Sequence, residues 1–320
     1  RAYGTSVSAS RLLCGSTPLH EELETRLAAL KSREACLLFS SGYLANLGLL
    51  TAFLDSDDVI FSDRLNHASI VDGGRLSAAQ VVVYDHCDPN HLEVLLRDTP
   101  AKRRLIVSES VFSMDGDLAP VPELLALAER FGALLVLDEA HATGLFGEDG
   151  AGVLSLFGIS DGPIAVVGTL SKALGSAGGF VAADQTLISV LVNRARSFIF
   201  NTALPAGAVG AALESIKLLE TEPWRRERSL ALAGSLREGI LRRDFPPSNS
   251  ASQIVPLMIG DTEAALALDA RLLEAGVLAR AIRPPTVPEG TSRIRFNVMA
   301  THDEGDIEHL LELLGPSPLP

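Results

Sequence analysis

The sequence has few residues that could build a metal site, a disulfide framework or a membrane span. Only three of its 320 residues are cysteine, and Cys14, Cys36 and Cys87 fit neither a zinc pattern nor a disulfide framework. We therefore expect no metal and three reduced thiols, as in a cytoplasmic protein. No apolar run approaches the roughly 18 residues that a membrane helix needs, and no secretory segment opens the chain. No membrane association is expected.

Basic residues are scarce, and so are the features of nucleic-acid enzymes. Lysine and arginine number 27 against 40 acidic residues, which gives a formal net charge of −13. This average charge repels a phosphate backbone. Residues 138–141 spell Asp-Glu-Ala-His, the motif of one helicase class, but no Gly-Lys-Ser or Gly-Lys-Thr of a phosphate loop occurs. We therefore expect no nucleic-acid partner and no helicase activity.

Apolar runs alternate with helical patterns over the first two thirds of the chain. Aromatic residues make up only 5%, so aliphatic side chains must build the core. Strands are expected in residues 34–39, 58–63, 80–86, 104–114, 133–141 and 163–183, with helices between them, among them residues 18–31 and 120–132. This alternation predicts an α/β fold whose sheet is mostly parallel and flanked by helices.

The pattern changes after residue 205. Residues 206–243 predict a long, broken helix, and shorter strands and helices follow to residue 315. We expect a large domain over residues 1–205 and a smaller C-terminal α+β domain over residues 206–320.

Side chains that carry chemistry follow several expected strands. They are His67, Ser113, Asp138, His141 and Lys172, together with a small-residue turn at Gly42 and Tyr43. Because the carboxyl ends of parallel strands meet at one edge of a sheet, these side chains should converge. A lysine can form a Schiff base with pyridoxal phosphate, a carboxylate can keep its ring nitrogen protonated, and a helix start can receive its phosphate. The set predicts a pyridoxal phosphate site.

The motifs around these residues identify a family. In chain order they are FSSGYLANLG, DRLNHASIVDGGRLS, SESVFSMDGDLAP, LDEAHATGLFGEDGAG and VGTLSKALGSAGGF. From Gly4 to about Leu314 the chain resembles the α-oxoamine synthases, which condense an amino acid with an acyl thioester and release carbon dioxide. The resemblance implies a fold-type-I pyridoxal phosphate transferase and a homodimer, because a second subunit generally completes such sites.

The resemblance assigns four catalytic roles. Lys172 would carry the cofactor and move the Cα proton of the amino acid, whereas an ordinary lysine would be a solvated surface residue. Asp138 would pair with the ring nitrogen, the alternative being a helix cap. His141 would hydrogen-bond the phenolic oxygen, and His67 would stack on the ring. Structural histidines are the alternative for both.

Five further residues would hold the cofactor by resemblance. Gly42 and Tyr43 would offer backbone N–H groups, unless they only cap a core helix. Thr169 would contact the phosphate within the subunit, and Thr202 would reach the phosphate of the partner subunit. Ser113 would lie near the phenolic oxygen.

Two arginines are expected to bind substrate, since a guanidinium matches a carboxylate bidentately. Arg295 would take the amino-acid carboxylate, and Arg283 the acyl substrate or its distal carboxylate. Arg293 lies on the same face of the expected strand as Arg295, so spacing does not choose between them. Surface ion pairs are the alternative.

The segment AIRPPTVPEGTSRIRFNVMATH, residues 281–302, most resembles the branch of the family that joins L-alanine to a pimeloyl thioester in biotin synthesis. Coenzyme A and a carrier protein both remain open as the thiol. A sister synthase such as glycine C-acetyltransferase is the nearest alternative. A non-catalytic partner subunit is another, but such subunits lack the lysine that stands here at position 172.

Overall fold

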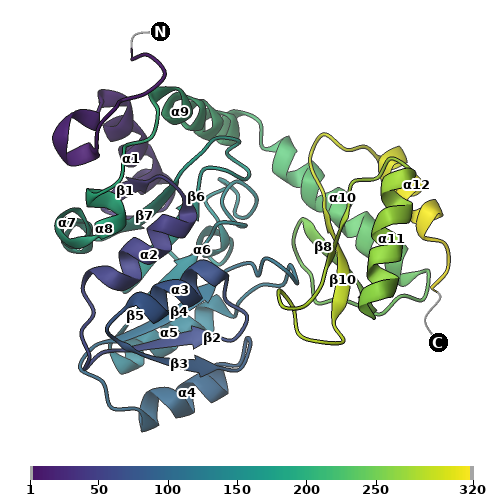
Figure 1. Ribbon diagram of the computed structural model, residues 1–320, viewed down its shortest axis with the longest axis horizontal. Coiled ribbons are helices and arrows are strands. Elements are labelled where there is room, and N and C mark those ends of the chain that lie inside the picture. The colour runs from purple at the N-terminus through teal and green to yellow at the C-terminus, as the bar shows by residue number, and fades with distance from the viewer. Residues whose placement is uncertain (1–2, 318–320) are drawn as a thin grey trace. The chain divides into compact units, whose positions relative to one another are not determined.

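The computed structural model describes residues 3–317, which divide into two compact units (Figure 1). Unit 1 comprises residues 3–111 and 119–223, and unit 2 comprises residues 112–118 and 224–317. The expected boundary lay between residues 205 and 206. Helix α9 (Ala206–Thr221) follows that point but packs against α1 (Pro18–Leu30), so it belongs to unit 1.

A seven-stranded mixed sheet forms the centre of unit 1, in the order β1-β7-β6-β5-β4-β2-β3. Strand β7 is antiparallel to both of its neighbours, whereas β6, β5, β4, β2 and β3 run parallel. The strands are β1 (Ala35–Phe39), β2 (Val59–Asp63), β3 (Gln80–Tyr84), β4 (Arg104–Glu109), β5 (Ala133–Asp138), β6 (Ile164–Thr169) and β7 (Gly179–Ala183). Because β1 and β6 are both antiparallel to β7, β1 has the same direction as the parallel strands.

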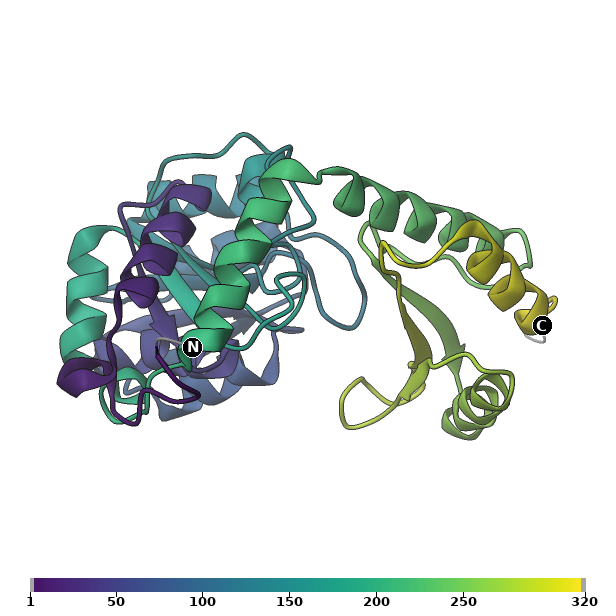
Figure 2. The same cartoon turned by 90° about the horizontal axis from the view of Figure 1, so that it is seen from above.

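Helices flank this sheet (Figure 2). Besides α1 and α9 they are α2 (Gly42–Ala52), α3 (Ala68–Leu76), α4 (Pro89–Asp98), α5 (Val121–Phe131), α6 (Val153–Leu156), α7 (Gln185–Arg194) and α8 (Arg196–Ile199), and a short π-helix spans Arg11–Gly15. Local chemistry sets several ends. The carboxylates of Asp88 and Asp184 cap α4 and α7, and Gly132 ends α5 in the left-handed conformation.

Aliphatic side chains build the core of unit 1. Every residue of β2 and β6 is buried, as expected for strands covered on both faces. Leu49 and Leu50 of α2 pack into the same cluster as Val136 of β5 and Val181 of β7. The core therefore fixes the carboxyl ends of the strands, where the chemistry lies.

Unit 2 is a three-stranded antiparallel sheet with three helices. The elements are α10 (Trp224–Leu241), β8 (Ile254–Gly260), α11 (Thr262–Glu274), β9 (Arg280–Ile282), β10 (Ser292–Asn297) and α12 (Glu304–Leu314), and the sheet order is β8-β10-β9. Helices α10 and α12 lie side by side (Figure 2). Asp303 and Asp306 form a capping box at the start of α12.

A segment from the middle of the chain completes unit 2. The carbonyl of Gly116 accepts a hydrogen bond of 3.0 Å from the amide of Ala251. Gly116 has φ of 72°, and a Cβ there would lie 2.3 Å from the carbonyl oxygen of Ile254. Only glycine suits this position, because the backbone is left-handed and the space is filled.

The expected α/β class and the broken helix after residue 205 are confirmed, since α9 and α10 separate at Pro223. The helices α7 and α8 and the π-helix were not anticipated. Among residues 3–317, no helix combines the length and the apolar character that crossing a membrane requires.

Candidate active site

Six strands of unit 1 end at one edge of the sheet, and five of them lead into expected or buried polar residues. The last residues of the six strands are Phe39, Asp63, Tyr84, Glu109, Asp138 and Thr169. The segments that follow carry Gly42, His67, His141 and Lys172, as expected. The amino end of β7 lies at the same edge, because that strand runs in the opposite direction. The parallel sheet thus brings together residues that are far apart in the sequence.

Lys172 lies in the tight connection between β6 and β7. The amide of Gly175 donates to the carbonyl of Lys172 at 2.9 Å, and the amide of Ser176 donates to Leu170 at 2.8 Å. The exposed side chain places Nζ 2.9 Å from Nε2 of His141. An amine and an imidazole at this distance can exchange a proton.

Asp138 ends β5 and is buried, at 6% exposure. Its Oδ1 accepts a hydrogen bond of 2.9 Å from the amide of Ala140, and its Oδ2 accepts one of 2.7 Å from Nδ2 of Asn46 on α2. Both oxygens therefore have N–H donors, which is the environment of a buried carboxylate.

The first turn of α2 forms a backbone cradle at the same edge. The Ser41 hydroxyl caps this 11-residue helix by accepting from the amide of Leu44 at 3.2 Å. A Cβ on Gly179 would lie 2.4 Å from the amide nitrogen of Gly42, and a Cβ on Gly42 would lie 3.3 Å from Cβ of Thr169. Backbone and hydroxyl groups thus gather at a helix N-terminus, where anions bind.

Tyr43 and Thr202 flank this cradle. The Tyr43 hydroxyl hydrogen-bonds to the Asp72 carboxylate, and this bond raises the pKa of the phenol. Thr202 is exposed, and its carbonyl accepts from the Ser40 hydroxyl at 3.2 Å. Its backbone also forms an isolated bridge with Ser10. Both residues lie next to the start of α2 of their own chain.

His67 is the N-cap of α3. Its Nδ1 accepts from the Ser69 amide at 3.2 Å and lies 2.8 Å from the Ser69 hydroxyl. Surrounding protein atoms desolvate the ring and lower the pKa of His67, the charge of Asp138 opposes this effect, and the charge of Lys172 adds to it. His67, Asp138 and Lys172 therefore share one electrostatic neighbourhood.

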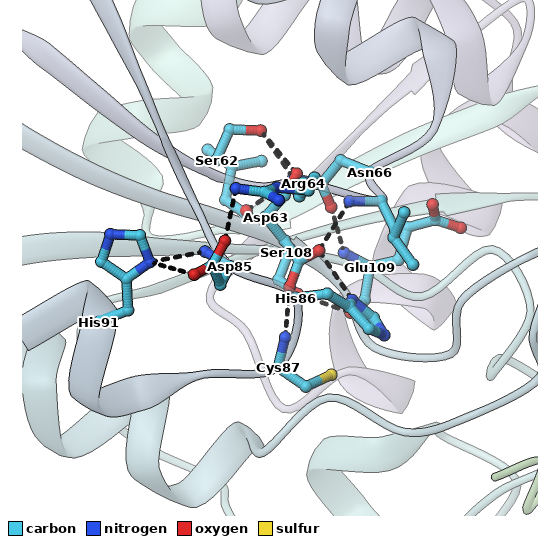
Figure 3. Close-up of polar contacts among 12 residues, drawn as sticks. Ser62, Asp63, Arg64, Asn66, Asp85, His86, Cys87, His91, Ser108 and Glu109 are labelled. Carbon is cyan, nitrogen blue, oxygen red and sulfur yellow. Dashed lines mark hydrogen bonds and ion pairs between the residues drawn. The ribbon is translucent and has the colours of Figure 1, made fainter. Parts of the chain in front are cut away.

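Two buried side chains anchor the loop that carries His67 (Figure 3). The Asp63 carboxylate accepts from Nδ1 of His86 and from the amide of Cys87, both at 2.9 Å. Asn66 donates to the carbonyl of Val107 at 2.8 Å and accepts from the amide of Glu109 at 2.9 Å. The Asn66 amide thus takes the place of a further β2 residue beside β4.

Asp63, His86 and Cys87 also place possible metal ligands within 4.8 Å of one another. Their hydrogen bonds account for this geometry, because each Asp63 oxygen already has a donor. We therefore interpret the cluster as an anchor for the loop.

Glu139, the residue after Asp138, is fully buried and holds the turn that follows β5. Its carboxylate lies 2.6 Å from Nζ of Lys31, and Nζ also donates to the Thr143 hydroxyl at 2.8 Å. The amide of Leu154 donates to Glu139 Oε1 at 3.1 Å. No local pattern marks this pair, because Lys31 lies at the end of α1, 108 residues away.

The remaining expected residues, Ser113, Arg283 and Arg295, belong to unit 2. Nε of Arg295 donates to the carbonyl of Ser113 at 2.6 Å. Arg293 is buried and ion-paired with Asp115, so the structure separates the two arginines of β10. Arg283 is exposed and makes a hydrogen bond of 3.4 Å to the adjacent Pro284 carbonyl.

The residues of unit 1 fit pyridoxal 5'-phosphate chemically. An amine stands at Lys172 for the aldehyde, a buried carboxylate stands at Asp138 for the ring nitrogen, and the start of α2 offers N–H groups to a phosphate. An imidazole beside the amine, from His141, can serve a phenolic oxygen.

Comparisons with known proteins agree with this geometry. The profile of the family described as aminotransferase class I and II matches residues 6–314. An 8-amino-7-oxononanoate synthase from Anaeromyxobacter dehalogenans is 49% identical over 312 residues, or 98% of this chain and 78% of that protein. Another from Nitrosococcus oceani is 46% identical over 316 residues, or 98% and 84%.

Solved structures show the same fold. A serine palmitoyltransferase from S. paucimobilis with a bound PLP–myriocin aldimine has a TM-score of 0.93 at 34% identity, covering 97% of this chain and 79% of that one. An 8-amino-7-oxononanoate synthase from Francisella tularensis has a TM-score of 0.82 at 27% identity, covering 98% and 96%. The chain belongs to the aminotransferase class I and II family of pyridoxal phosphate enzymes and, within it, to the α-oxoamine synthases, with 8-amino-7-oxononanoate synthases among its near relatives.

Proposed function

We propose that this chain joins L-alanine to a pimeloyl thioester and releases carbon dioxide and the thiol, giving 8-amino-7-oxononanoate for biotin synthesis. The observation that carries the proposal is the Lys172 amine, 2.9 Å from His141 on an edge that Asp138 shares. The identity of 46–49% with 8-amino-7-oxononanoate synthases, over 98% of the chain, supports the choice of substrates.

Bound pyridoxal phosphate would supply an electron sink for the carbanion formed at Cα of the amino acid. Asp138 would hold a proton on the ring nitrogen, because its buried carboxylate is an acceptor fixed by Asn46 and Ala140. Lys172 Nζ would take the Cα proton. His141 Nε2, which lies beside Nζ, would orient the amine and hydrogen-bond the phenolic oxygen.

The remaining residues would bind and orient. The amides at the start of α2 and the Thr169 hydroxyl would hold the phosphate. His67 would stack on the ring, held by its cap on α3. In unit 2, Arg295 would bind the amino-acid carboxylate and Arg283 the acyl substrate. Of the two arginines on β10, Arg295 is the better candidate for the carboxylate, because Arg293 already forms an ion pair with Asp115.

The direct test supplies L-alanine with pimeloyl-CoA, or with a pimeloyl carrier protein, to the pyridoxal phosphate-loaded protein. Mass spectrometry should detect 8-amino-7-oxononanoate, with one thiol and one carbon dioxide released per product. K172A should lose both the visible absorbance of the attached cofactor and the product. The control K217A changes an exposed lysine that pairs with Glu214, so it should keep both. Cofactor-loaded protein that makes no product with either thioester would refute the assignment.

A sister synthase is the second candidate, because the fold matches serine palmitoyltransferase with a TM-score of 0.93. A grid of alanine, glycine and serine against pimeloyl, acetyl and palmitoyl thioesters separates the two. The highest kcat/KM should fall on alanine with pimeloyl. A maximum at another position would keep the family and replace the substrates.

We also propose that the protein acts in the cytoplasm as a homodimer. The three cysteines are free, as expected in a reducing compartment. Leu12, Leu13 and Phe200 are 51%, 82% and 71% exposed and lie close in sequence to Ser10 and Thr202, whose backbones pair. Such apolar exposure beside a residue expected to reach a partner's phosphate favours a second copy as its cover. Sedimentation should give a dimer, and L13E/F200E should give a monomer with weaker cofactor binding. A monomeric wild type would refute the proposal.

A further inference from the structure

We propose that Asn46 and Ser69 are positioning residues that join Asp138 to His67 by one directed chain of hydrogen bonds and hold His67 as the neutral tautomer protonated on Nε2. The catalytic meaning of this inference rests on the proposed function. The hydrogen-bond chain itself lies among the protein's own residues.

The chain has three links. Asn46 Nδ2 lies 2.7 Å from Asp138 Oδ2 and 2.9 Å from the Ser69 hydroxyl oxygen. That oxygen lies 2.8 Å from Nδ1 of His67. Asn46 and Ser69 are each 1% exposed, so water does not compete for these contacts. A buried route thus connects the end of β5 to the N-cap of α3 through one residue of α2.

The direction of each link follows from what the groups can do. The Ser69 backbone amide also contacts Nδ1, at 3.2 Å, and an amide can only donate. Nδ1 therefore carries its lone pair, and the Ser69 hydroxyl must donate to it. The hydroxyl oxygen then accepts from one hydrogen of the Asn46 amide, and the other hydrogen goes to the Asp138 carboxylate.

The orientation of Asn46 agrees with this direction. Its Oδ1 is buried and has no hydrogen-bond partner among residues 3–317. Turning the amide over would face Oδ1 toward the Asp138 carboxylate, where two acceptors would meet. The unpaired Asn46 carbonyl is the cost of this orientation, in which one N–H group donates to the charged Asp138 carboxylate and the other to the Ser69 hydroxyl.

A neutral His67 suits its surroundings. The charged groups that act on it are Asp138, Asp72 and Lys172. Adding a second proton, on Nδ1 of the Nε2–H ring, would break the bonds from Ser69 and would place an imidazolium beside the Lys172 charge. The chain of hydrogen bonds therefore keeps the ring uncharged, with Nε2–H as its one donor, while the same asparagine fixes Asp138.

The test is ¹⁵N NMR of the histidine rings near pH 7, before and after loading with pyridoxal phosphate. The wild-type His67 signal, assigned by its loss in H67N, should show a proton on Nε2. In S69A the ratio of the two tautomers should move toward Nδ1–H by about fivefold, the ratio that one hydrogen bond supports. S69T keeps the hydroxyl and should restore the ratio.

A matched control is S197A. The Ser197 hydroxyl donates to the Leu44 carbonyl at 2.7 Å, so this change also removes one hydroxyl contact with α2, but outside the chain. Its tautomer ratio should equal that of the wild type. N46A offers a second variant if S69A does not fold, and its His67 signal should change in the same direction.

The outcomes separate this inference from the proposed function. A wild-type His67 protonated on Nδ1 would overturn the inference without any variant, as would an unchanged ratio in folded S69A and N46A. A tautomer shift in a protein that makes no product would keep the inference and refute only the proposed function.

Discussion

The Nζ of Lys31 lies 2.6 Å from the carboxylate of Glu139, and the two side chains are 1% and 0% exposed. The pair joins the end of α1 to the segment between Asp138 and His141. Nζ also donates to the Thr143 hydroxyl and to the carbonyl of Ala151. Four acceptor and donor groups thus hold the turn that follows β5, so the geometry of Asp138 and His141 depends on a helix far away in the sequence.

Removing the cation of this pair should destabilise the protein strongly. K31M leaves the Glu139 charge buried without its partner, which costs about 3–5 kcal/mol. Urea unfolding should show this loss as a lower midpoint. The control R26M, on the same helix, removes the cation of a pair with Glu220 that is 3.6 Å long and exposed on both sides. It should cost no more than about 1 kcal/mol. Equal losses in the two variants would contradict the role of burial.

His20 should make stability depend on pH. Burial and the Arg11 charge lower the pKa of this fully buried histidine, whose Nε2 contacts the Leu204 carbonyl at 3.0 Å. As the pH falls below the ordinary imidazole pKa of about 6.5, His20 binds a proton in the unfolded chain but stays neutral in the folded chain. The free energy of unfolding should therefore fall, by up to about 1.4 kcal/mol per pH unit.

Urea midpoints at pH 7.5 and 5.5 measure this effect. H20Q should show a smaller difference between the two than the wild type. H309Q changes an exposed histidine on α12 and should keep the wild-type difference. A wild-type difference that survives in H20Q would assign the pH dependence elsewhere.

A methyl group on Gly179 should displace the phosphate cradle. The added Cβ would lie 2.4 Å from the Gly42 amide nitrogen and from the Ser41 carbonyl carbon, so the backbone must shift. G179A should bind pyridoxal phosphate at least about tenfold more weakly, which equals about 1.4 kcal/mol. Absorbance titration measures the affinity. G210A, on α9 with open space around the position, should bind normally and gain about 0.5–1 kcal/mol in stability.

The two arginines of β10 should differ in what they affect. R293M breaks the ion pair between Arg293, whose side chain is 4% exposed, and Asp115, whose side chain is 32% exposed. The free energy of unfolding should fall by about 2 kcal/mol. R295K should cost only about 1 kcal/mol of stability, from the bond to the Ser113 carbonyl, and should raise the KM for the amino acid by about 10–100-fold, since a bidentate charged contact is lost. Steady-state kinetics and urea unfolding on both variants check this. The reverse pattern would exchange the two roles.

Much of unit 1 could be predicted because its signals are local. Apolar runs end at polar residues, so Asp138 and Lys172 were placed at strand ends before any geometry was known. Because the carboxyl ends of parallel strands lie at one edge of a sheet, the convergence of these residues could also be predicted. Motifs such as SGYLAN and LNHAS contain Asn46 and Ser69, but no pattern shows that these two residues touch.

Long-range pairing could not be predicted. The contact of Lys31 with Glu139 spans 108 residues, and a lysine at the end of a helix normally faces water. The resemblance placed Ser113 near the phenolic oxygen of the cofactor, and that role stays a prediction. The structure assigns Ser113 to unit 2, since β4 ends at Glu109 and the backbone then turns back on itself, with Phe112 donating to Asp117.

The segment of residues 112–118 has a consequence for how the chain is made. It is synthesised long before β8 and β10, yet its partners are Ala251, Arg293 and Arg295. When unit 1 leaves the ribosome, strands β8 and β10 have not yet been synthesised. Residues 112–118 can therefore take their final contacts only after the C-terminal part of the chain is made. A gene fragment that begins at residue 224 would encode a unit 2 without this inserted segment. Dividing the chain at one position therefore cannot yield both units complete.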